Sequence, residues 1–474
     1  MIQIMNYLSR IRPDEMCRVL LLGSVGEFQE MIVHLQKYVW VQKIFLLPAT
    51  GEKVFCENYK TDIIEILDRE QLQKENLKID IILFDKSSEE EICTLAKMKP
   101  IYLIGKISHR LDYFKMWEMF RAVSSYIYIE RDRGQIAERS EGVSEQYEIL
   151  EWEKPKTGVE LSIILPTYNV EKYLPKCIET LIKWEAPYVE YLFVNDGSTD
   201  HSAQIIQSYS KIDKRIQLLT KKNGGCASAR NYGIENAQGR YVGFVDADDF
   251  IDESMFQKLL SRAMMGNYEL AYCGYQEYYE DSEKIRPVEN DYLGEPYLTG
   301  TYRSDKVQLL AVNTRVAIWR CLYKKSVLYE KNIRFHEDLR MFDDLPFRIE
   351  YIFAAKSAVC ISEYLYFYRI GRAEQDTACV DERLFVHFEI FRYLDDYISK
   401  YKDRKLWDLL QVVKIQTHGY ALKKIEDRWK PSYVKQAGAQ LREHAGYIRN
   451  VILILLYAGK GNLIWFTRIW MHSK

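Results

Sequence analysis

The sequence lacks the features that define several protein classes. No apolar run reaches the ~18 residues that cross a bilayer, and Met1–Arg12 contain no signal-peptide core. The 9 cysteines are scattered without a Cys-x-x-Cys pair, which disfavours a zinc site or a disulfide framework and is typical of a reducing compartment. Lys and Arg number 66 against 68 Asp and Glu, so the charge balance gives no argument for nucleic-acid binding. We therefore expect a cytoplasmic protein without a nucleic-acid partner.

The first 130 of the 474 residues alternate short apolar runs with helical stretches. This alternation predicts a small Rossmann-like α/β domain at residues 1–130. The expected strands are Arg18–Leu22, Ile44–Leu47, Ile79–Phe84, Ile101–Ile104 and Tyr126–Ile129, with a helix over Glu27–Val39. Gly23 and Gly26 do not complete G-x-G-x-x-G, so a structural or partner-docking role is favoured over cofactor binding. The charged residues 131–158 lack a sustained apolar period and are expected to form a linker.

Three later apolar runs each end in polar residues. Because ligands of open α/β sheets bind at the carboxyl ends of the strands, we expect these polar residues to share one crevice. The runs are Leu161–Leu165, ending in Pro166-Thr167-Tyr168-Asn169; Tyr191–Val194, ending in Asn195-Asp196-Gly197; and Tyr241–Val245, ending in Asp246-Ala247-Asp248-Asp249. Carboxylates such as Asp246 and Asp248 suit Mg²⁺ or Mn²⁺ held together with substrate phosphates.

Each of these ends also has a simpler interpretation. Asp196-Gly197 is a turn pair, and Ser198, Thr199 or Asp200 can cap the next helix. The carboxylate of Asp196 can equally accept a hydrogen bond from a nucleotide base on which Tyr168 stacks. Both roles can coexist.

A glycine-rich helix start lies between the second and third of these runs. Ala227, Ala229 and Gly233 permit a close approach of this helix to the sheet. Arg230 and the nearby Lys221 supply positive charge for a diphosphate, although a single helical arginine is more often a solvated residue.

As a set, these motifs resemble those of the family 2 glycosyltransferases over about residues 161–372. The resemblance implies a GT-A-type nucleotide-binding domain with a mixed central sheet at residues 159–372. It further implies a set of nucleotide-binding residues, namely Pro166, Thr167, Tyr168, Asn169, Asp196, Arg230 and Asp246. Asp246 and Asp248 would form the D-x-D pair for Mn²⁺ or Mg²⁺, with Asp248 as the direct ligand.

The segment Phe342–Tyr351 begins a helix in which an Asp before Pro346 can act as the cap. In the family this place usually reads Glu-Asp, so the resemblance makes Asp344 the catalytic base and puts Asp343 in the place of the Glu. Leu365–Arg369 resembles the closing strand of the family, and Gly371–Thr377 is expected to be a loop over the site, including Arg372. The chain departs from the family at Arg320-Cys321, where Asn-Lys is commoner.

Residues 373–474 are expected to be mostly α-helical. No acidic residue follows Glu443, whereas aromatic residues and cations do. Such a segment is suited to peripheral contact with the inner face of the cell membrane. A packed terminal helix with a few exposed basic residues accounts for the pattern equally well.

The resemblance implies an inverting, metal-dependent glycosyltransferase. It would move a sugar from a nucleotide-diphosphate sugar, UDP-linked by expectation, to a carbohydrate or lipid-linked saccharide acceptor in bacterial surface polysaccharide synthesis. One alternative is a nucleotidyltransferase, although the sequence contains no separate basic, Gly-rich triphosphate loop. The other is a catalytically silent nucleotide-sugar-binding scaffold, which loss of the D-x-D pair or of the base would indicate; both are present.

Overall fold

The computed structural model describes residues 158–289, 301–339, 341–371 and 379–473. In the first 157 residues it describes seven strands together with Ile32, Leu35 and Ile79. The chain divides into two compact units. Unit 1 comprises Met1–Lys156 with Ser261–Asn267, and unit 2 comprises Thr157–Leu260 with Tyr268–Lys474.

Unit 1 contains a seven-stranded sheet of order β3-β2-β1-β4-β5-β6-β7. Neighbouring strands from β1 to β6 pair in parallel, in the doubly wound order that the Rossmann fold uses. The predicted Rossmann-like domain is thereby confirmed. The short β3 was not predicted, and the turn and helix expected after Gly23 lie outside the described residues except for Ile32 and Leu35. The strands are β1 (Cys17–Gly23), β2 (Val41–Pro48), β3 (Ile64–Ile66), β4 (Ile81–Phe84), β5 (Tyr102–Ile107), β6 (Tyr126–Asp132) and β7 (Tyr147–Glu153).

The segment expected as a linker contributes to this sheet. β7 lies within residues 131–158 and pairs antiparallel with β6, from Tyr126 opposite Glu153 to Asp132 opposite Tyr147. The linker prediction is therefore wrong for these residues. A sheet edge accepts a strand with charged side chains because one of its sides remains in solvent.

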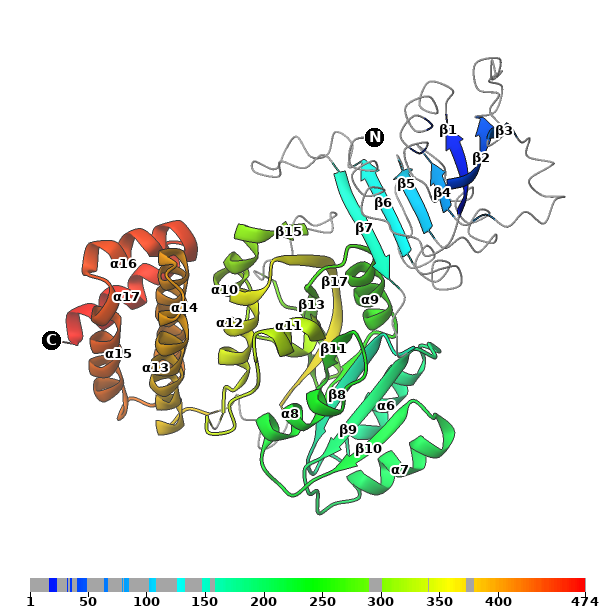
Figure 1. The fold of residues 1–474 in the computed structure, drawn as a ribbon. Coiled ribbons are helices and arrows are strands. Elements are labelled where there is room, and N and C mark those ends of the chain that lie inside the picture. The colour runs from blue at the N-terminus through cyan, green and yellow to red at the C-terminus, as the bar shows by residue number, and fades with distance from the viewer. Residues whose placement is uncertain are drawn as a thin grey trace. The chain divides into compact units, whose positions relative to one another are not determined.

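Unit 2 is built on a mixed sheet of order β10-β9-β8-β11-β16-β13-β17-β12, with β14 on β13 and β15 on β17 (Figure 1). Strands β10, β9, β8 and β11 pair in parallel, whereas β16 runs antiparallel to both of its neighbours. This is the mixed α/β sheet predicted for residues 159–372. The strands are β8 (Leu161–Thr167), β9 (Val189–Asn195), β10 (Ile216–Thr220), β11 (Tyr241–Phe244), β12 (Phe250–Ile251), β13 (Leu270–Tyr279), β14 (Lys284–Pro287), β15 (Thr301–Arg303), β16 (Cys321–Lys324) and β17 (Ser357–Ile370).

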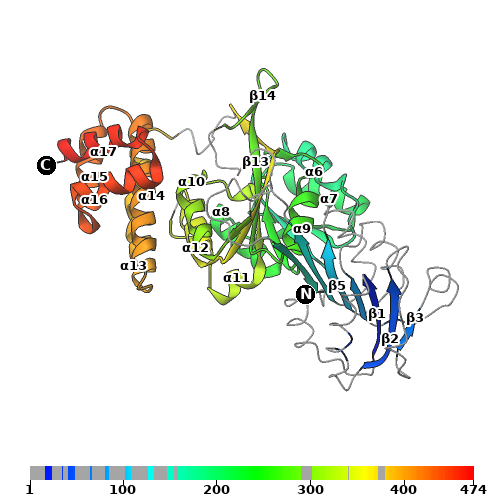
Figure 2. The same ribbon diagram turned by 90° about the horizontal axis from the view of Figure 1, so that it is seen from above.

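Helices cover both faces of this sheet, with α8, α10, α11 and α12 on one side and α6 and α7 on the other (Figure 2). The bounds are α6 (Leu174–Ile182), α7 (Ser202–Ile212), α8 (Cys226–Asn236), α9 (Met255–Met265), η3 (Ser304–Leu309), α10 (Leu310–Asn313), η4 (Ile318–Arg320), α11 (Lys325–Glu330) and α12 (Asp344–Ala354). The predicted close approach of α8 is confirmed, because a Cβ atom on Gly233 would lie 2.3 Å from Cγ2 of Ile164 in β8.

The C-terminal region is helical, as predicted. It comprises η6 (Glu382–Phe385), α13 (Val386–Ser399), α14 (Arg404–Lys424), α15 (Lys430–His444), α16 (Tyr447–Leu453), the π-helical turn η7 (Ile454–Ala458) and α17 (Gly461–His472). These helices share an apolar core that includes Tyr433, Leu441 and Phe466. The region packs on the sheet-bearing part of unit 2, where the Tyr393 hydroxyl donates to Glu350 of α12 at 2.7 Å.

Candidate functional site

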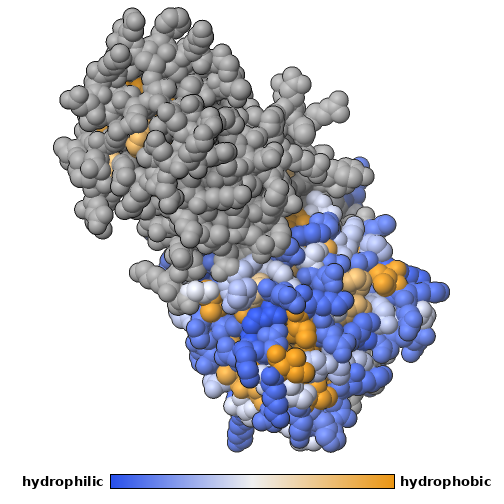
Figure 3. All heavy atoms as spheres, turned by 90° about the vertical axis from the view of Figure 1, so that its right-hand side faces the viewer, coloured by the Kyte–Doolittle hydropathy of each residue, from blue (hydrophilic) through white to orange (hydrophobic). Residues whose placement is uncertain are grey.

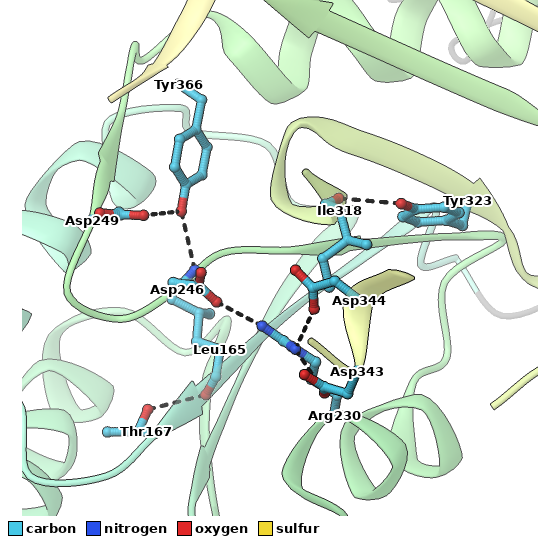
Figure 4. Close-up of polar contacts among 10 residues, drawn as sticks. All are labelled: Leu165, Thr167, Arg230, Asp246, Asp249, Ile318, Tyr323, Asp343, Asp344 and Tyr366. Atoms are coloured by element: carbon cyan, nitrogen blue, oxygen red, sulfur yellow. Dashed lines mark hydrogen bonds and ion pairs between the residues drawn. The ribbon is translucent and has the colours of Figure 1, made fainter. Parts of the chain in front are cut away.

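A buried guanidinium group, that of Arg230 on α8, joins three carboxylates from two other parts of the chain (Figure 4). Its Nη2 donates to Asp246 Oδ1 at 3.0 Å, beyond the end of β11. Its Nη1 donates to Asp343 Oδ2 at 3.0 Å and to Asp344 Oδ1 at 2.6 Å, at the start of α12. Arg230 is only 4% exposed, so the pairing takes place largely out of water. The structure thus brings together Arg230, Asp246 and Asp344, and adds Asp343.

The two carboxylates at the start of α12 do not cap the helix. Asp343 is the N-cap residue but its side chain makes no capping hydrogen bond, and Asp344 is the first helical residue. Helix capping, the simpler interpretation, is therefore wrong, and both side chains face Arg230. The two preceding residues have φ values of 69° at Met341 and 54° at Phe342. Such backbone conformations are unfavourable for residues other than glycine and occur where the surrounding structure enforces them, commonly at functional sites.

Asp344 carries an unusually basic carboxylate. Burial raises the pKa of Asp344 to about 7; among its neighbours, the Arg230 cation opposes the rise, and the carboxylates of Asp343 and Asp246 add to it. The side chain keeps 23% of its surface exposed, so a reacting group can reach it. A carboxylate with a pKa near neutrality can act as a general base at physiological pH.

The turn Asp246–Asp249, which follows β11, is hydrogen-bonded to residues of β17, and the buried carboxylate of Asp249 accepts two of these bonds. The Tyr366 hydroxyl accepts from Asp246 N at 3.2 Å and donates to Asp249 Oδ2 at 2.8 Å. Arg369 donates its backbone N–H to Asp249 Oδ1 at 2.7 Å and its Nε to the carbonyl oxygen of Asp248 at 2.7 Å. Burial, together with the charges of Asp248 and Asp246, raises the pKa of Asp249 well above its usual range. The side chains of Asp246 and Asp248 remain partly exposed.

Sequence reasoning assigned no role to Asp249 or Tyr366. A β-strand that ends in Arg369 was expected, but the partners of its residues lie more than a hundred positions earlier in the chain. Periodicity and composition report on local structure, and they contain no signal for such a pairing.

Asn231, the residue after Arg230, holds the segment that precedes α12. Asn231 donates from Nδ2 to the Phe335 carbonyl oxygen at 2.8 Å and accepts from Phe335 N at 2.9 Å. It also donates to Glu337 Oε1 at 3.0 Å. The Phe335 ring lies 5.2 Å from the Arg230 guanidinium carbon and stacks on Phe347 of α12 at 4.0 Å. Two adjacent residues of α8 therefore position the segment that carries Asp343 and Asp344.

The predicted base-binding corner is formed by the ends of β8 and β9. The buried carboxylate of Asp196 accepts from Gly224 N at 3.0 Å, from Gly225 N at 2.8 Å and from Lys221 Nζ at 2.8 Å. Thr167 is also buried, and its hydroxyl donates to the Leu165 carbonyl oxygen at 3.0 Å. Lys221, expected near a diphosphate, is thus paired with Asp196.

Pro166 and Tyr168 are at least partly exposed, whereas Asn169 is hydrogen-bonded to the neighbouring loop. The Tyr168 ring is 49% exposed and Pro166 is partly exposed. Asn169 accepts from Thr199 N at 2.8 Å, and its backbone N–H donates to Ser198 Oγ at 3.2 Å, so it joins the loops after β8 and β9. Asp200 accepts from Ser202 N at 2.9 Å at the start of α7, which confirms a capping role for this residue.

Two sets of side chains in the described part of the chain are candidate metal ligands. Among the described residues, one group of three potential ligands is preassembled, Asp395, Glu443 and His444, in the C-terminal helices. There Lys414 Nζ lies 2.6 Å from both oxygens of Asp395, whereas Arg230 donates to Oδ1 of Asp246. Asp246 and Asp248 offer two partly exposed carboxylates at a strand end. This donor set fits Mg²⁺ or Mn²⁺, which commonly take one or two carboxylates and complete their shell with water and substrate phosphates.

Arg320 and the loop after β17 were also singled out in the sequence. Arg320, which stands where the family commonly has Asn, is 1% exposed and donates to the Cys273 carbonyl oxygen at 3.2 Å. Its side chain is therefore part of the packed interior. The loop expected over the site, with Arg372, lies outside the described residues apart from Gly371.

A family model described as glycosyl transferase family 2 matches residues 162–330. This match, which covers less than half of the chain, shows a similarity to glycosyl transferase family 2 over those residues. The uncharacterized glycosyltransferase EpsJ of Bacillus subtilis is 36% identical over 214 residues, which are 44% of this chain and 60% of EpsJ. The minor teichoic acid biosynthesis protein GgaB of Bacillus subtilis is 41% identical over 105 residues, 22% of this chain and 12% of GgaB. The chain thus matches less than two thirds of either relative.

The fold is also similar to that of a solved structure, S. aureus TarS 1–349 in complex with UDP-GlcNAc. The two share 18% sequence identity with a TM-score of 0.50, over 66% of this chain and 89% of that one. This likeness supports a GT-A-like architecture for the mixed sheet of unit 2.

Proposed function

We propose that the protein is an inverting, metal-dependent glycosyltransferase that moves a sugar from a UDP-sugar to an acceptor hydroxyl. The observation that supports the proposal is that Arg230 donates to both Asp344 and Asp246, so a carboxylate with a pKa of about 7 lies near the end of β11, which Asp246 and Asp248 follow. Direct displacement of a sugar needs a base for the acceptor hydroxyl and, in a metal-dependent enzyme, carboxylates that hold the cation beside the diphosphate.

The proposed reaction is a single displacement. Asp344 accepts the proton of the acceptor hydroxyl as its oxygen forms a bond to the anomeric carbon. The bond between that carbon and the donor diphosphate breaks with its electron pair leaving on the phosphate oxygen, and the anomeric configuration inverts. Arg230 keeps Asp344 oriented, and its positive charge favours the ionised form that accepts the proton.

Asp246 and Asp248 would hold Mn²⁺ or Mg²⁺, which when bound neutralises negative charge that develops on the departing diphosphate. Asp249, Tyr366 and Arg369 keep the backbone of this turn in place, so that both carboxylates project from it in a defined orientation. In this scheme Arg230 pairs with the carboxylates of the site and does not itself bind the diphosphate.

The proposed base-binding group is Pro166, Thr167, Tyr168, Asn169 and Asp196. The half-exposed Tyr168 ring can stack on uracil. Three donors already engage the Asp196 carboxylate, so we propose that it orders the Gly224-Gly225 turn as well as accepting from the base. UDP is proposed because the TarS structure of like fold contains UDP-GlcNAc.

The acceptor is proposed to be a carbohydrate or lipid-linked saccharide in surface polysaccharide synthesis. The name of GgaB, a teichoic acid biosynthesis protein, supports this assignment. We further propose that residues 159–372 form the catalytic domain and residues 373–474 a helical region. Residues 1–156, whose sheet includes β7, are proposed to form a separate domain of unknown role.

A panel of nucleotide sugars, each with and without Mn²⁺, tests the proposal by thermal shift and by donor hydrolysis. A ligand at a hundredfold excess over its Kd stabilises the folded state by about 2.7 kcal/mol, which a thermal shift detects. We expect a shift with a UDP-sugar that requires Mn²⁺, followed by slow release of the sugar. Binding without hydrolysis or transfer would favour the scaffold alternative, and metal-dependent turnover of a nucleoside triphosphate would favour a nucleotidyltransferase.

A further inference from the structure

The last two helical segments of unit 2 expose apolar side chains on their outer sides. Ile448 is 75% exposed, Leu456 67% and Ile464 71%. On α16 and η7 the exposed apolar residues Ile448, Ile452 and Leu455 recur every three or four positions and form a stripe. On α17 Ile464 and Met471 lie seven positions apart, with the exposed Arg468 between them. We define the C-terminal apolar face as Ile448, Ile452, Leu455, Leu456, Ile464 and Met471, all of which are at least 49% exposed.

The inner sides of the same segments are also apolar and are already packed. Ile454, Phe466 and Ile469 are each 0% exposed and belong to the core shared by the C-terminal helices. The packed terminal helix expected from the sequence is thus confirmed, but it leaves the outer stripe uncovered. A helix that is apolar on more than its core-facing side usually contacts a second apolar environment.

The charges around the C-terminal apolar face are positive. Lys460 and Arg468 are exposed, and Lys423 of α14 lies with its Nζ 5.2 Å from the Trp465 ring. No acidic residue occurs in residues 447–473, all of which the structure describes. Arg449 is paired with Asp408, so its charge is compensated within unit 2. The face therefore combines apolar side chains with uncompensated cations and an aromatic ring.

We infer that this face docks on an anionic lipid bilayer, with α16, η7 and α17 lying in the plane of the interface. Among the described residues no helix is long and apolar enough to cross a bilayer, so the mode of contact is interfacial. Apolar stripes enter the boundary between headgroups and acyl chains, Trp sits at headgroup level, and Lys and Arg bind lipid phosphates.

A second copy of the chain is a poorer fit to the same surface. In a symmetric dimer the patch meets itself, which would bring Lys460 and Arg468 close to the same cations of the other copy. On the face that Figure 3 shows, the described surface is mostly hydrophilic, with several groups of hydrophobic side chains among the hydrophilic ones. The inference does not depend on the proposed transfer reaction.

Vesicle flotation of the full chain without any sugar donor tests the inference. We expect the protein to float with phosphatidylcholine vesicles that contain phosphatidylglycerol and to remain unbound with pure phosphatidylcholine. Raising the salt concentration should weaken binding, because salt screens the contribution of the cations. Absence of flotation with the anionic vesicles overturns the inference.

Two pairs of matched variants locate the binding surface. Ile448→Gln with Leu456→Gln, and separately Lys460→Glu with Arg468→Glu, should each weaken binding about tenfold or more, since one cation near the surface contributes roughly fivefold. The controls are Ile212→Gln with Ile285→Gln, which remove two exposed apolar groups elsewhere, and Lys211→Glu with Lys214→Glu, which change the net charge equally. The controls should bind as the parent does.

Two results overturn the inference. One is equal loss of binding in test and control variants, which would indicate a charge or solubility effect that is independent of position. The other is parental vesicle binding by Ile448→Gln with Leu456→Gln, combined with loss of a dimer in light scattering, which would assign the face to a second copy. Circular dichroism and thermal unfolding of each variant verify that it is folded.

Discussion

Asp344 is subject to two opposing influences, because burial disfavours its charge while Arg230 favours it. Asp343 contacts the same Nη1 atom of Arg230, at 3.0 Å against 2.6 Å for Asp344. The two aspartates are therefore adjacent, chemically identical and paired with one cation. Each serves as a control for the other.

Asp344→Asn should reduce sugar transfer by about 10²–10⁴-fold, the usual contribution of a general base. The asparagine oxygen can still accept from Arg230, but it takes up no proton at neutral pH. The Kd for UDP should stay within about twofold, since the base-binding corner is unchanged. Initial-rate kinetics and calorimetry measure the two quantities. Asp343→Asn should have a milder effect on transfer; a parental rate in Asp344→Asn would place the base elsewhere, with Glu337 and Asp338 next to test.

The pH profile of transfer should report the raised pKa of Asp344. The base is active only when deprotonated, so kcat/KM should fall as the pH drops through about 7. The charge of Asp343 contributes to the raised pKa, so Asp343→Asn should move this acid limb to lower pH. Measuring kcat/KM of the parent and of Asp343→Asn between about pH 5 and pH 9 locates the acid limb in each. A limb that stays near pH 7 in Asp343→Asn contradicts the assignment.

Asp248→Ala should abolish the Mn²⁺-dependent part of the thermal shift with UDP. Its carboxylate is partly exposed at a strand end, so the variant should remain folded without ligand. Asp281→Ala, which removes an exposed carboxylate between β13 and β14, is the matched control. Retention of the Mn²⁺-dependent shift in Asp248→Ala would show that the metal is held by other groups.

At the scale of elements, β17 holds the D-x-D turn from the opposite side to α8. The hydroxyl of Tyr366 is the link, since it contacts both the Asp246 backbone and the buried Asp249 carboxylate. Arg230 of α8 contacts the same turn through Asp246, and it also contacts Asp344 at the start of α12. Two elements that are distant in sequence, α8 and β17, therefore contact one turn, and α12 is linked to it through Arg230.

Tyr366→Phe should lower the free energy of unfolding by about 1–3 kcal/mol, because Asp249 loses a donor while it remains buried. Tyr209→Phe is the control, since its hydroxyl also donates to a carboxylate, that of Glu179 at 3.0 Å, but at the surface. The control should cost less than about 1 kcal/mol. Urea unfolding measures both. An equal cost in the two variants would mean that the Tyr366–Asp249 contact does not stabilise the turn.

At the scale of the whole molecule, the C-terminal helices are part of unit 2 and not an appendage that can be removed. Phe466 is 0% exposed and Ile464, two residues earlier on α17, is 71% exposed. Deletion of residues 447–474 would uncover the core around Leu441 and Tyr433, so vesicle binding is better tested with substitutions on the outer face.

Phe466→Ala should cost about 3–5 kcal/mol of unfolding free energy, as expected for a large side chain removed from a packed core. Ile464→Ala removes an apolar group from the same helix and should change stability by less than about 0.5 kcal/mol. Thermal and chemical unfolding of both variants measure the difference. If Phe466→Ala proved as mild as Ile464→Ala, α17 would not be packed as described.

Local sequence patterns are sufficient to identify the strands of the mixed sheet and the polar residues at their ends. Apolar runs such as Tyr241–Val245 identify strands locally, and the rule that ligands bind at carboxyl ends then places Asp196 and Asp246 at one edge of the sheet. The close packing of α8 was likewise predictable from Gly233 and its small neighbours. The strand at Tyr147–Glu153 was missed because a charged edge strand has no apolar period.

Which charged side chains pair with one another depends on how the elements pack. Arg230 and Asp344 are 114 residues apart, and their ion pair exists because α8 and α12 cover the same face of the sheet. The same holds for the link from Tyr366 to Asp249, and for the start of α12, where capping was the local expectation. The partner that a charged side chain contacts depends on which groups lie within reach and on how deeply they are buried. Both follow from the packing of the elements, which local sequence patterns do not encode.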